Sequence, residues 1–161
     1  MIRRGLVLAM FAVVSMCLVH PSAGLAQEKK KADEPSSNIS GTYSFLRDGE
    51  FVQVTVEDGQ VSGYVSRFGN TESDKDQFID QFFEKASLKG NHLSFKTKTV
   101  HGVWYEFSGD VVTTGSKLPS QEGYRVIKGM LVEHAADAKG SDKARQRQAE
   151  FKSFPSDMSQ P

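Results

Sequence analysis

Three of the four histidines and several carboxylates are the side chains of this 161-residue chain that could do chemistry. His92, His101 and His134 could ligate a metal ion if they converged across strands. Each lies beside a turn or at a strand end, so the sequence favours separate histidines at the rims of a sheet, and we predict no metal site. The chain has no Gly-x-Ser-x-Gly, His-Glu-x-x-His, phosphate-loop or Gly-x-Gly-x-x-Gly pattern. We therefore expect no catalytic residue and no cofactor.

The carboxylates form one run and one isolated candidate. The run consists of Asp74, Asp76, Asp80 and Glu84. It lacks the residue order and the terminal glutamate of a calcium loop, so we interpret it as the solvated face of a helix. Glu106 lies among aromatic residues, beside Trp104 and Tyr105, but strand alternation places Glu106 and Trp104 outward. A catalytic carboxylate pair needs one acid in an apolar pocket, and the sequence does not predict one here.

Charge and cysteine content exclude two further classes of function. The chain has 20 basic and 20 acidic residues, and a neutral surface does not favour nucleic acid, which requires a basic patch. The single cysteine, Cys17, lies in the N-terminal apolar run. The folded part therefore has no disulfide, no thiolate nucleophile and no cysteine metal ligand. Packing and strand hydrogen bonds alone must stabilise the domain.

Residues 1–26 have the three parts of a secretory signal peptide. Arg3 and Arg4 form a positive head, and an apolar run spans residues 6–19. Small residues then precede a cleavage site before Gln27. The run is shorter than the roughly 20 apolar residues of a membrane span, and Cys17 lacks the small preceding residue of a lipidation site. We expect a bacterial protein exported to the periplasm or the extracellular space, with no stable membrane span after cleavage; an uncleaved anchor is the alternative.

The next segments differ in their periodicity. Residues 27–38 are charged and have no apolar period, so we predict a disordered leader. Residues 39–155 alternate between apolar and polar side chains, as in Val52, Val54 and Val56, which is typical of strands with one buried face. Turn signals such as Asp48-Gly49 and Asp58-Gly59 separate the runs, and the gaps are too short for crossover helices. We therefore predict an all-β domain, an antiparallel up-and-down meander of about eight strands, followed by a loose tail at 156–161.

Glycines within the predicted strands indicate that the sheet is curved. Gly63, Gly109 and Gly129 each have an apolar residue two positions before and two positions after them, in the pattern apolar, x, Gly, x, apolar. Glycine inside a strand is used where the strand bends or where another backbone approaches closely. The recurrence favours a sheet curled into a small barrel over a flat sandwich.

Two segments depart from the strand pattern. Residues 73–84 carry Phe78, Ile79, Phe82 and Phe83 at the spacing of a helical stripe, which predicts one short helix. The alternative is that a strand leading to Leu88 already begins at Phe82, and both hold if the helix ends near Gln81. Residues 135–148 are rich in Ala, Lys, Asp and Arg, and we interpret them as a mobile excursion before the last strand.

The inward face of the barrel supplies the candidate binding residues. Alternation assigns to it Tyr43, Phe45, Val65, Phe95, Val103, Tyr105, Phe107 and Phe151. Such residues fill a solid core, or they line a cavity for a ligand in small antiparallel barrels. Both alternatives are open at the level of the sequence.

The order of these residues resembles the calycin-like barrels of the lipocalin and avidin type. Gly41-Thr42-Tyr43 is similar to the Gly-x-Trp that opens a lipocalin barrel, with tyrosine in the place of tryptophan. The run from Ala86 to Phe95 resembles the repeating hairpins of small exported bacterial barrels of unassigned function. The resemblance covers about residues 39–155 and implies a barrel fold with an interior ligand; the single Trp104 departs from the several tryptophans of an avidin-type biotin site.

Three functional hypotheses follow. The first is an exported, non-enzymatic β-barrel that binds a small apolar or amphipathic ligand in its interior. The second is a cell-envelope interaction module with a solid core and an exposed aromatic face of Tyr64, Phe68, Trp104 and Tyr124. The third is an enzyme with its site at the rim near Arg67, His92 or His101.

Overall fold

The computed structural model describes residues 38–69, 72, 74–136 and 141–155. The predicted signal peptide (1–26), nearly all of the predicted leader (27–37) and the predicted tail (156–161) lie outside these residues. Within the described residues, no helix is long and apolar enough to span a membrane.

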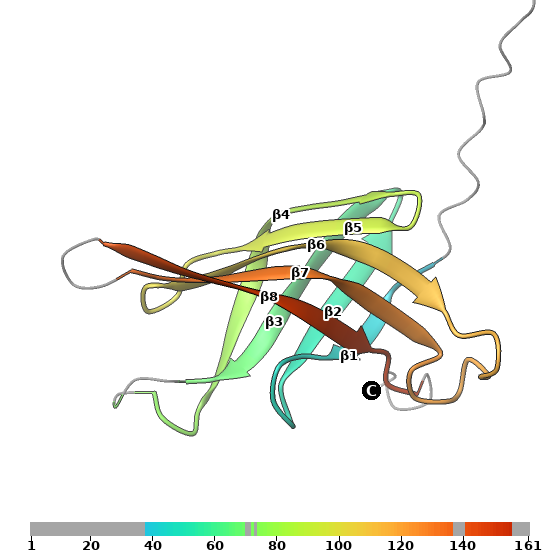
Figure 1. The fold of residues 1–161 in the computed structure, drawn as a ribbon, viewed down its shortest axis with the longest axis horizontal. Coiled ribbons are helices and arrows are strands. Elements are labelled where there is room, and N and C mark those ends of the chain that lie inside the picture. The colour runs from blue at the N-terminus through green and yellow to red at the C-terminus, as the bar shows by residue number, and fades with distance from the viewer. Residues whose placement is uncertain (1–37, 70–71, 73, 137–140, 156–161) are drawn as a thin grey trace, which may run out of the picture. The chain divides into compact units, whose positions relative to one another are not determined.

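Eight strands form one antiparallel sheet in which every strand pairs with its neighbours in sequence (Figure 1). The strands are β1 (Gly41–Ser44), β2 (Phe51–Glu57), β3 (Gln60–Phe68), β4 (Phe78–Lys89), β5 (His92–Thr97), β6 (Val103–Thr113), β7 (Arg125–Ala136) and β8 (Asp142–Lys152). The sheet curls into a half-barrel, which confirms the predicted all-β meander. Short connections such as the one between β2 and β3 leave no room for a crossover, so antiparallel pairing of neighbours is the only solution.

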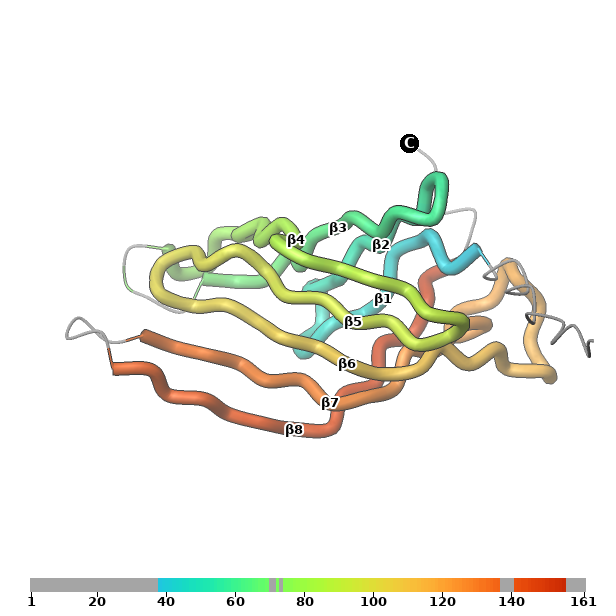
Figure 2. Tube along the Cα trace, turned by 90° about the horizontal axis from the view of Figure 1, so that it is seen from above, coloured from blue at the N-terminus to red at the C-terminus, as the bar shows by residue number. Residues whose placement is uncertain are grey.

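The two ends of the sheet meet at one end of the half-barrel only. Tyr43 on β1 forms a bridge with Ser153, just after β8. The Phe154 amide donates to the Thr42 carbonyl (2.9 Å), and the Lys152 amide donates to Ser44 Oγ (3.0 Å). Because β1 has only four residues, it covers the end of β8 and no more. Towards its start, β8 runs beside β7 along the outer edge of the sheet (Figure 2).

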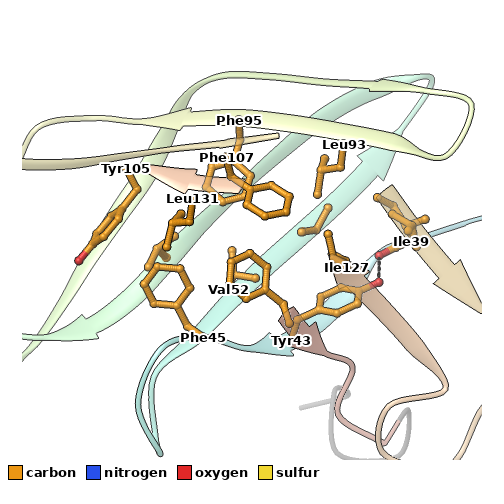
Figure 3. Packing of buried hydrophobic residues seen from close by; sticks show 14 of the residues in the cluster. Ile39, Tyr43, Phe45, Val52, Leu93, Phe95, Tyr105, Phe107, Ile127 and Leu131 are labelled. Atoms are coloured by element: carbon orange, nitrogen blue, oxygen red, sulfur yellow. Dashed lines mark hydrogen bonds between the residues drawn. The ribbon is translucent and has the colours of Figure 1, made fainter. Parts of the chain in front are cut away.

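The apolar core fills the closed end of the half-barrel (Figure 3). Its rings touch one another: Phe95 lies 5.3 Å from Phe107, and Phe107 lies 4.9 Å from Phe151, measured between ring centroids. The Tyr43 hydroxyl donates to the Ile39 carbonyl at 2.6 Å, so the buried polar end of this side chain is satisfied. Direct ring contact of this kind is the packing of a solid core.

Close backbone approach explains the strand glycines. Gly109 on β6 and Gly129 on β7 stand opposite each other in the register. A Cβ added at Gly129 would overlap the Ser108 carbonyl, and one added at Gly63 would overlap the Gln53 carbonyl. The positions that the sequence pattern singled out are thus the places where a side chain does not fit between paired strands.

The predicted helix at 73–84 is wrong for the residues that the structure describes, 74–84. Strand β4 begins at Phe78, and Ile79 and Gln81 face inward while Phe78 and Phe82 face solvent. A spacing of four residues keeps two side chains on one face of a strand as well as on one face of a helix, so the four apolar residues satisfied both patterns. Pairing with β3 and β5 supplies the strand hydrogen bonds and decides between them.

The predicted excursion at 135–148 is wrong for the residues described. Strand β7 continues to Ala136 and β8 already begins at Asp142. These ends of β7 and β8 lie beyond the closed part of the sheet, where inward positions remain open to water. They pair with each other through their backbones without needing apolar side chains, which is why no apolar alternation marks them.

Gly129→Ala is expected to lower the free energy of unfolding by about 1–3 kcal/mol, because the added methyl group must push β6 and β7 apart. Gly115→Ala is the matched control, since no atom lies within 4 Å of its added Cβ; it should change stability by less than about 0.5 kcal/mol. Urea unfolding of both variants makes the comparison. Equal effects would contradict the close-approach explanation.

Candidate functional site

A charged pocket lies on the concave face beside the apolar core, towards the open end of the half-barrel. Its cavity volume is about 210 Å³. It is lined by Leu46, Arg47, Glu50, Arg67, Phe68, Tyr105, Glu133 and Arg147. We name this the mouth pocket.

Strand alternation places four of the lining residues on the inward side of the sheet. In four strands, the inward position next to the apolar core holds a polar side chain. These pairs are Val65 and Arg67 on β3, Phe107 and Tyr105 on β6, Leu131 and Glu133 on β7, and Ala149 and Arg147 on β8. Since side chains alternate along a strand, each pair shares one face and lies about 7 Å apart. On β3, β7 and β8 the concave face therefore changes from apolar to charged within one alternation step, whereas on β6 the neutral Tyr105 is followed by the buried, apolar Val103.

Glu50 is a buried carboxylate held by several donors. Its side chain is 3% exposed and forms an ion pair with Arg47 at 2.6 Å. The Arg47 amide donates to Glu50 Oε2 (3.1 Å), and the Phe68 amide donates to Glu50 Oε1 (3.1 Å). These donors offset the cost of taking a carboxylate out of water. The Arg47 guanidinium also lies over the Phe68 ring, 5.3 Å from its centroid.

Arg67 is the most buried cation of the pocket, with 2% of its surface exposed. Its Nε donates to Gln81 Oε1 at 2.5 Å and its Nη1 donates to the Phe68 carbonyl at 3.0 Å. Gln81 is itself fully buried, and its Nε2 donates to the Val103 carbonyl at 2.8 Å. Gln81 therefore orients Arg67, because its amide is held on both sides.

Arg147 and Tyr105 complete the lining. Arg147 Nη2 donates to Glu133 Oε2 at 2.9 Å, while its Nε is buried without a hydrogen-bond partner among the described residues. The Tyr105 ring packs edge-on against Phe45 at 5.2 Å, and its oxygen points away from the apolar cluster (Figure 3). Burial raises the pKa of Tyr105 to about 12, and the nearby Arg67 acts in the opposite direction. Tyr105 is therefore a neutral hydrogen-bonding group at physiological pH.

All eight predicted lining residues are buried, and seven of them belong to the solid core rather than to the mouth pocket. They are Tyr43, Phe45, Val65, Phe95, Val103, Tyr105, Phe107 and Phe151, with exposed fractions from 0 to 7%. Only Tyr105 lines the mouth pocket. Sequence reasoning named Arg67 as a rim residue but missed Glu50, Glu133 and Arg147. For Glu133 and Arg147, the signal was inward parity with the neighbouring apolar positions.

The histidines do not converge. His92 begins β5 at the closed end, where its Nδ1 lies 2.8 Å from Asp110 Oδ1. His134 lies six register positions away from that pair along β6, opposite Trp104, and stacks on the indole at 4.6 Å. His101 precedes β6 and pairs with the buried Asp74 at 2.7 Å. Among the described residues, no group of three or more histidines or carboxylates is arranged to hold a metal ion.

Of the four residues predicted for an outer aromatic face, Tyr64 and Phe68 contact other aromatic rings on β2 and β4. Tyr64 contacts Phe51 and Phe82 with centroids 5.9 and 5.5 Å away, so the three rings form a row across β2, β3 and β4. Phe68 contacts Phe78 at 4.5 Å. We name these five residues the aromatic row.

The other two residues predicted for that face lie elsewhere. Trp104 lies on β6 and stacks on His134 of the neighbouring β7, in another part of the sheet. Tyr124 contacts the Arg125 guanidinium in the segment before β7. All five residues of the aromatic row therefore lie on β2, β3 and β4.

Two larger hollows lie on the outer face of the sheet. One, of about 440 Å³, is lined mainly by outward side chains of β4 to β7, including Ser94, Ser108 and Met130. The other, of about 420 Å³, lies between β3 and β4 beside Tyr64 and Phe82. None of the charged residues that line either hollow is buried, so neither concentrates charge as the mouth pocket does.

No protein family, no curated protein and no solved structure matches this chain. The class of protein therefore follows from its fold and its pocket: an all-β half-barrel with a charged pocket on its concave face.

Tyr105→Phe is expected to flatten the dependence of stability on alkaline pH. The wild-type hydroxyl has a pKa of about 12 in the folded state, against 10.0 ordinarily. Its contribution is complete below pH 10 and is lost as pH rises towards 12, because the unfolded chain ionises first; this amounts to roughly 2–3 kcal/mol. Urea unfolding at pH 9, 10, 11 and 12 measures it. Superimposable profiles for the two proteins would show that Tyr105 is not buried as described.

Proposed function

We propose that this protein is an exported, non-enzymatic binding protein that takes a small amphipathic anion in its mouth pocket. The observation that carries the proposal is the convergence of three arginines and only two glutamates on one concave cavity. The buried Arg67 and Glu50 are costly to place there, and no packing need of the core requires them. A charged group that is buried and oriented beside a cavity is typical of a binding site.

The chemistry of the lining selects the class of ligand. Guanidinium groups present forked donors that match the two oxygens of a carboxylate or phosphate. The neutral Tyr105 hydroxyl adds one more hydrogen-bonding group beside them. Leu46 supplies an apolar side chain to the same lining, against which a short hydrocarbon portion packs.

The solid core supports this pocket rather than enclosing the ligand. A cavity of about 210 Å³ is small for a whole drug-sized ligand and suits an anionic head group with a short apolar part. The likeness of the sequence to lipocalin-type barrels is consistent with an interior ligand, and here it contributes an analogy of fold rather than of site. The proposal involves no catalytic step.

Binding of octanoate, measured by isothermal calorimetry with octylammonium as the charge-reversed probe, tests the proposal. We expect octanoate to bind and octylammonium not to bind. Arg147→Gln should raise the dissociation constant at least about tenfold, the effect of losing one charge-assisted hydrogen bond. Lys128→Gln is the control, because it removes a positive charge on the outer face, where the side chain is more exposed than that of Arg147 (58% against 37%). Equal binding of both probes, or an equal loss in the control variant, would reject the proposal.

A second candidate function, a cell-envelope interaction module, is favoured by the aromatic row. Phe78 and Phe82 are each 55% exposed, which is unusual for large apolar side chains gathered on one face. In this case the row forms the centre of a protein interface and the mouth pocket has only a structural role.

Crosslinking in an envelope fraction separates this candidate from the first. Phe82→Ser should abolish a specific crosslinked product that the wild-type protein forms. Trp104→Ala, which alters an aromatic residue outside the row, serves as the control. Retention of the product in Phe82→Ser removes the candidate.

A further inference from the structure

We propose that the outer edge of β8 between Ala144 and Glu150 accepts an acidic, extended polypeptide segment as an additional strand. This interaction surface is distinct from the proposed anion site and shares only Arg147 with it. The inference rests on the direction of the backbone groups of β8 and on the charge of its inward side chains.

The hydrogen bonds at the end of β8 define which residues face the free edge. The Ser153 amide donates to the Arg125 carbonyl on the β7 side (2.9 Å), and the Ser153 carbonyl accepts from the Gly123 amide (2.7 Å). The Lys152 amide instead points to β1, where it donates to Ser44 Oγ. Odd-numbered residues of β8 therefore bond towards β7 and even-numbered residues face the other way.

This alternation continues along the whole strand, because the register between β7 and β8 has no shift from Val126 to Ala136. The backbone amides and carbonyls directed to the outer edge are those of Ala144, Gln146, Gln148 and Glu150. Among the residues that the structure describes, no strand pairs with this edge, since β1 ends its pairing at Ser44. A row of unpaired backbone donors and acceptors is a template for strand addition.

The side chains of β8 select the charge of the added strand. Lys143, Arg145 and Arg147 alternate on the concave face, and the first two are exposed. The opposite face of the same stretch carries the uncharged Ala144, Gln146 and Gln148. A partner strand with acidic side chains at alternate positions would place them directly across from the basic ones, where opposite charges stabilise cross-strand pairs.

The same charges disfavour a second copy of the chain as the occupant. A two-fold pairing of β8 with itself centred on Gln146 sets Arg145 opposite Arg147. A pairing centred on Arg147 sets this residue opposite itself. Like charges directly opposite each other are destabilising, and basic residues on an edge are a common protection against self-association. The basic stripe therefore disfavours self-pairing in these registers and favours an acidic strand.

The probe is a fluorescein-labelled peptide with alternating glutamate and valine, compared with its lysine–valine counterpart by fluorescence anisotropy. We expect the glutamate peptide to bind and the lysine peptide not to bind. Gln146→Pro removes an outward amide that β7 does not use, so the fold is retained. It should weaken peptide binding at least tenfold, while Gln146→Ala, the matched control, should leave it unchanged. Arg145→Gln should weaken it severalfold.

Amide hydrogen exchange distinguishes strand addition from charge attraction alone, which would not protect individual backbone amides. The peptide should slow exchange of the Ala144, Gln146 and Gln148 amides and leave the Arg145 amide unchanged. Equal peptide binding by Gln146→Pro and Gln146→Ala would overturn the proposal, as would absence of binding. Dimerisation that Gln146→Pro abolishes would also overturn it, because the occupant would then be a second copy. Octanoate binding by Gln146→Pro should be retained, so the outcome is independent of the anion site.

Discussion

The shortness of β1 is the constraint on which the rest of the structure depends. Four residues pair with β2 and reach β8 only near Tyr43 and Ser153, so the sheet closes at one end. Where it closes, inward side chains are covered on every side and must be apolar. Where it stays open, inward positions carry charge: Lys143 and Arg145 are exposed to water, and the buried Arg67 is held by hydrogen bonds. Because β1 pairs with only the end of β8, a single sheet contains both a solid core and a charged pocket.

Buried charge in the mouth pocket is compensated group by group. Glu50 accepts from Arg47 and from the Phe68 amide, and Arg67 donates to the buried Gln81. Each of these contacts limits the rotamers of a charged side chain before any ligand arrives. A site ordered in this way loses less conformational entropy when a ligand binds. The same contacts join β3, β4 and the segment between β1 and β2, so the pocket and the local fold stabilise each other.

The alternation of apolar and polar residues predicted most strands of the sheet. It failed where a spacing fits both a helix and a strand, and where a strand carries no apolar alternation because no core covers it. The alternation around Val52 and Val103 identified strands and their buried faces, and Gly63, Gly109 and Gly129 marked close backbone approach. The spacing of Phe78 and Phe82 fits both helix and strand, so only pairing with β3 resolved it. The start of β8 carries no apolar alternation because no core covers it.

Taken by itself, the sequence determined the all-β class, the order of the strands and the inward direction of residues such as Tyr105 and Phe151. These properties depend on neighbours a few positions apart. Only the tertiary structure decided how far the sheet closes and that Glu50, Arg67 and Arg147 share one cavity. Their convergence depends on strand register and on the curvature of the whole sheet, which are set by pairing between residues far apart in the chain.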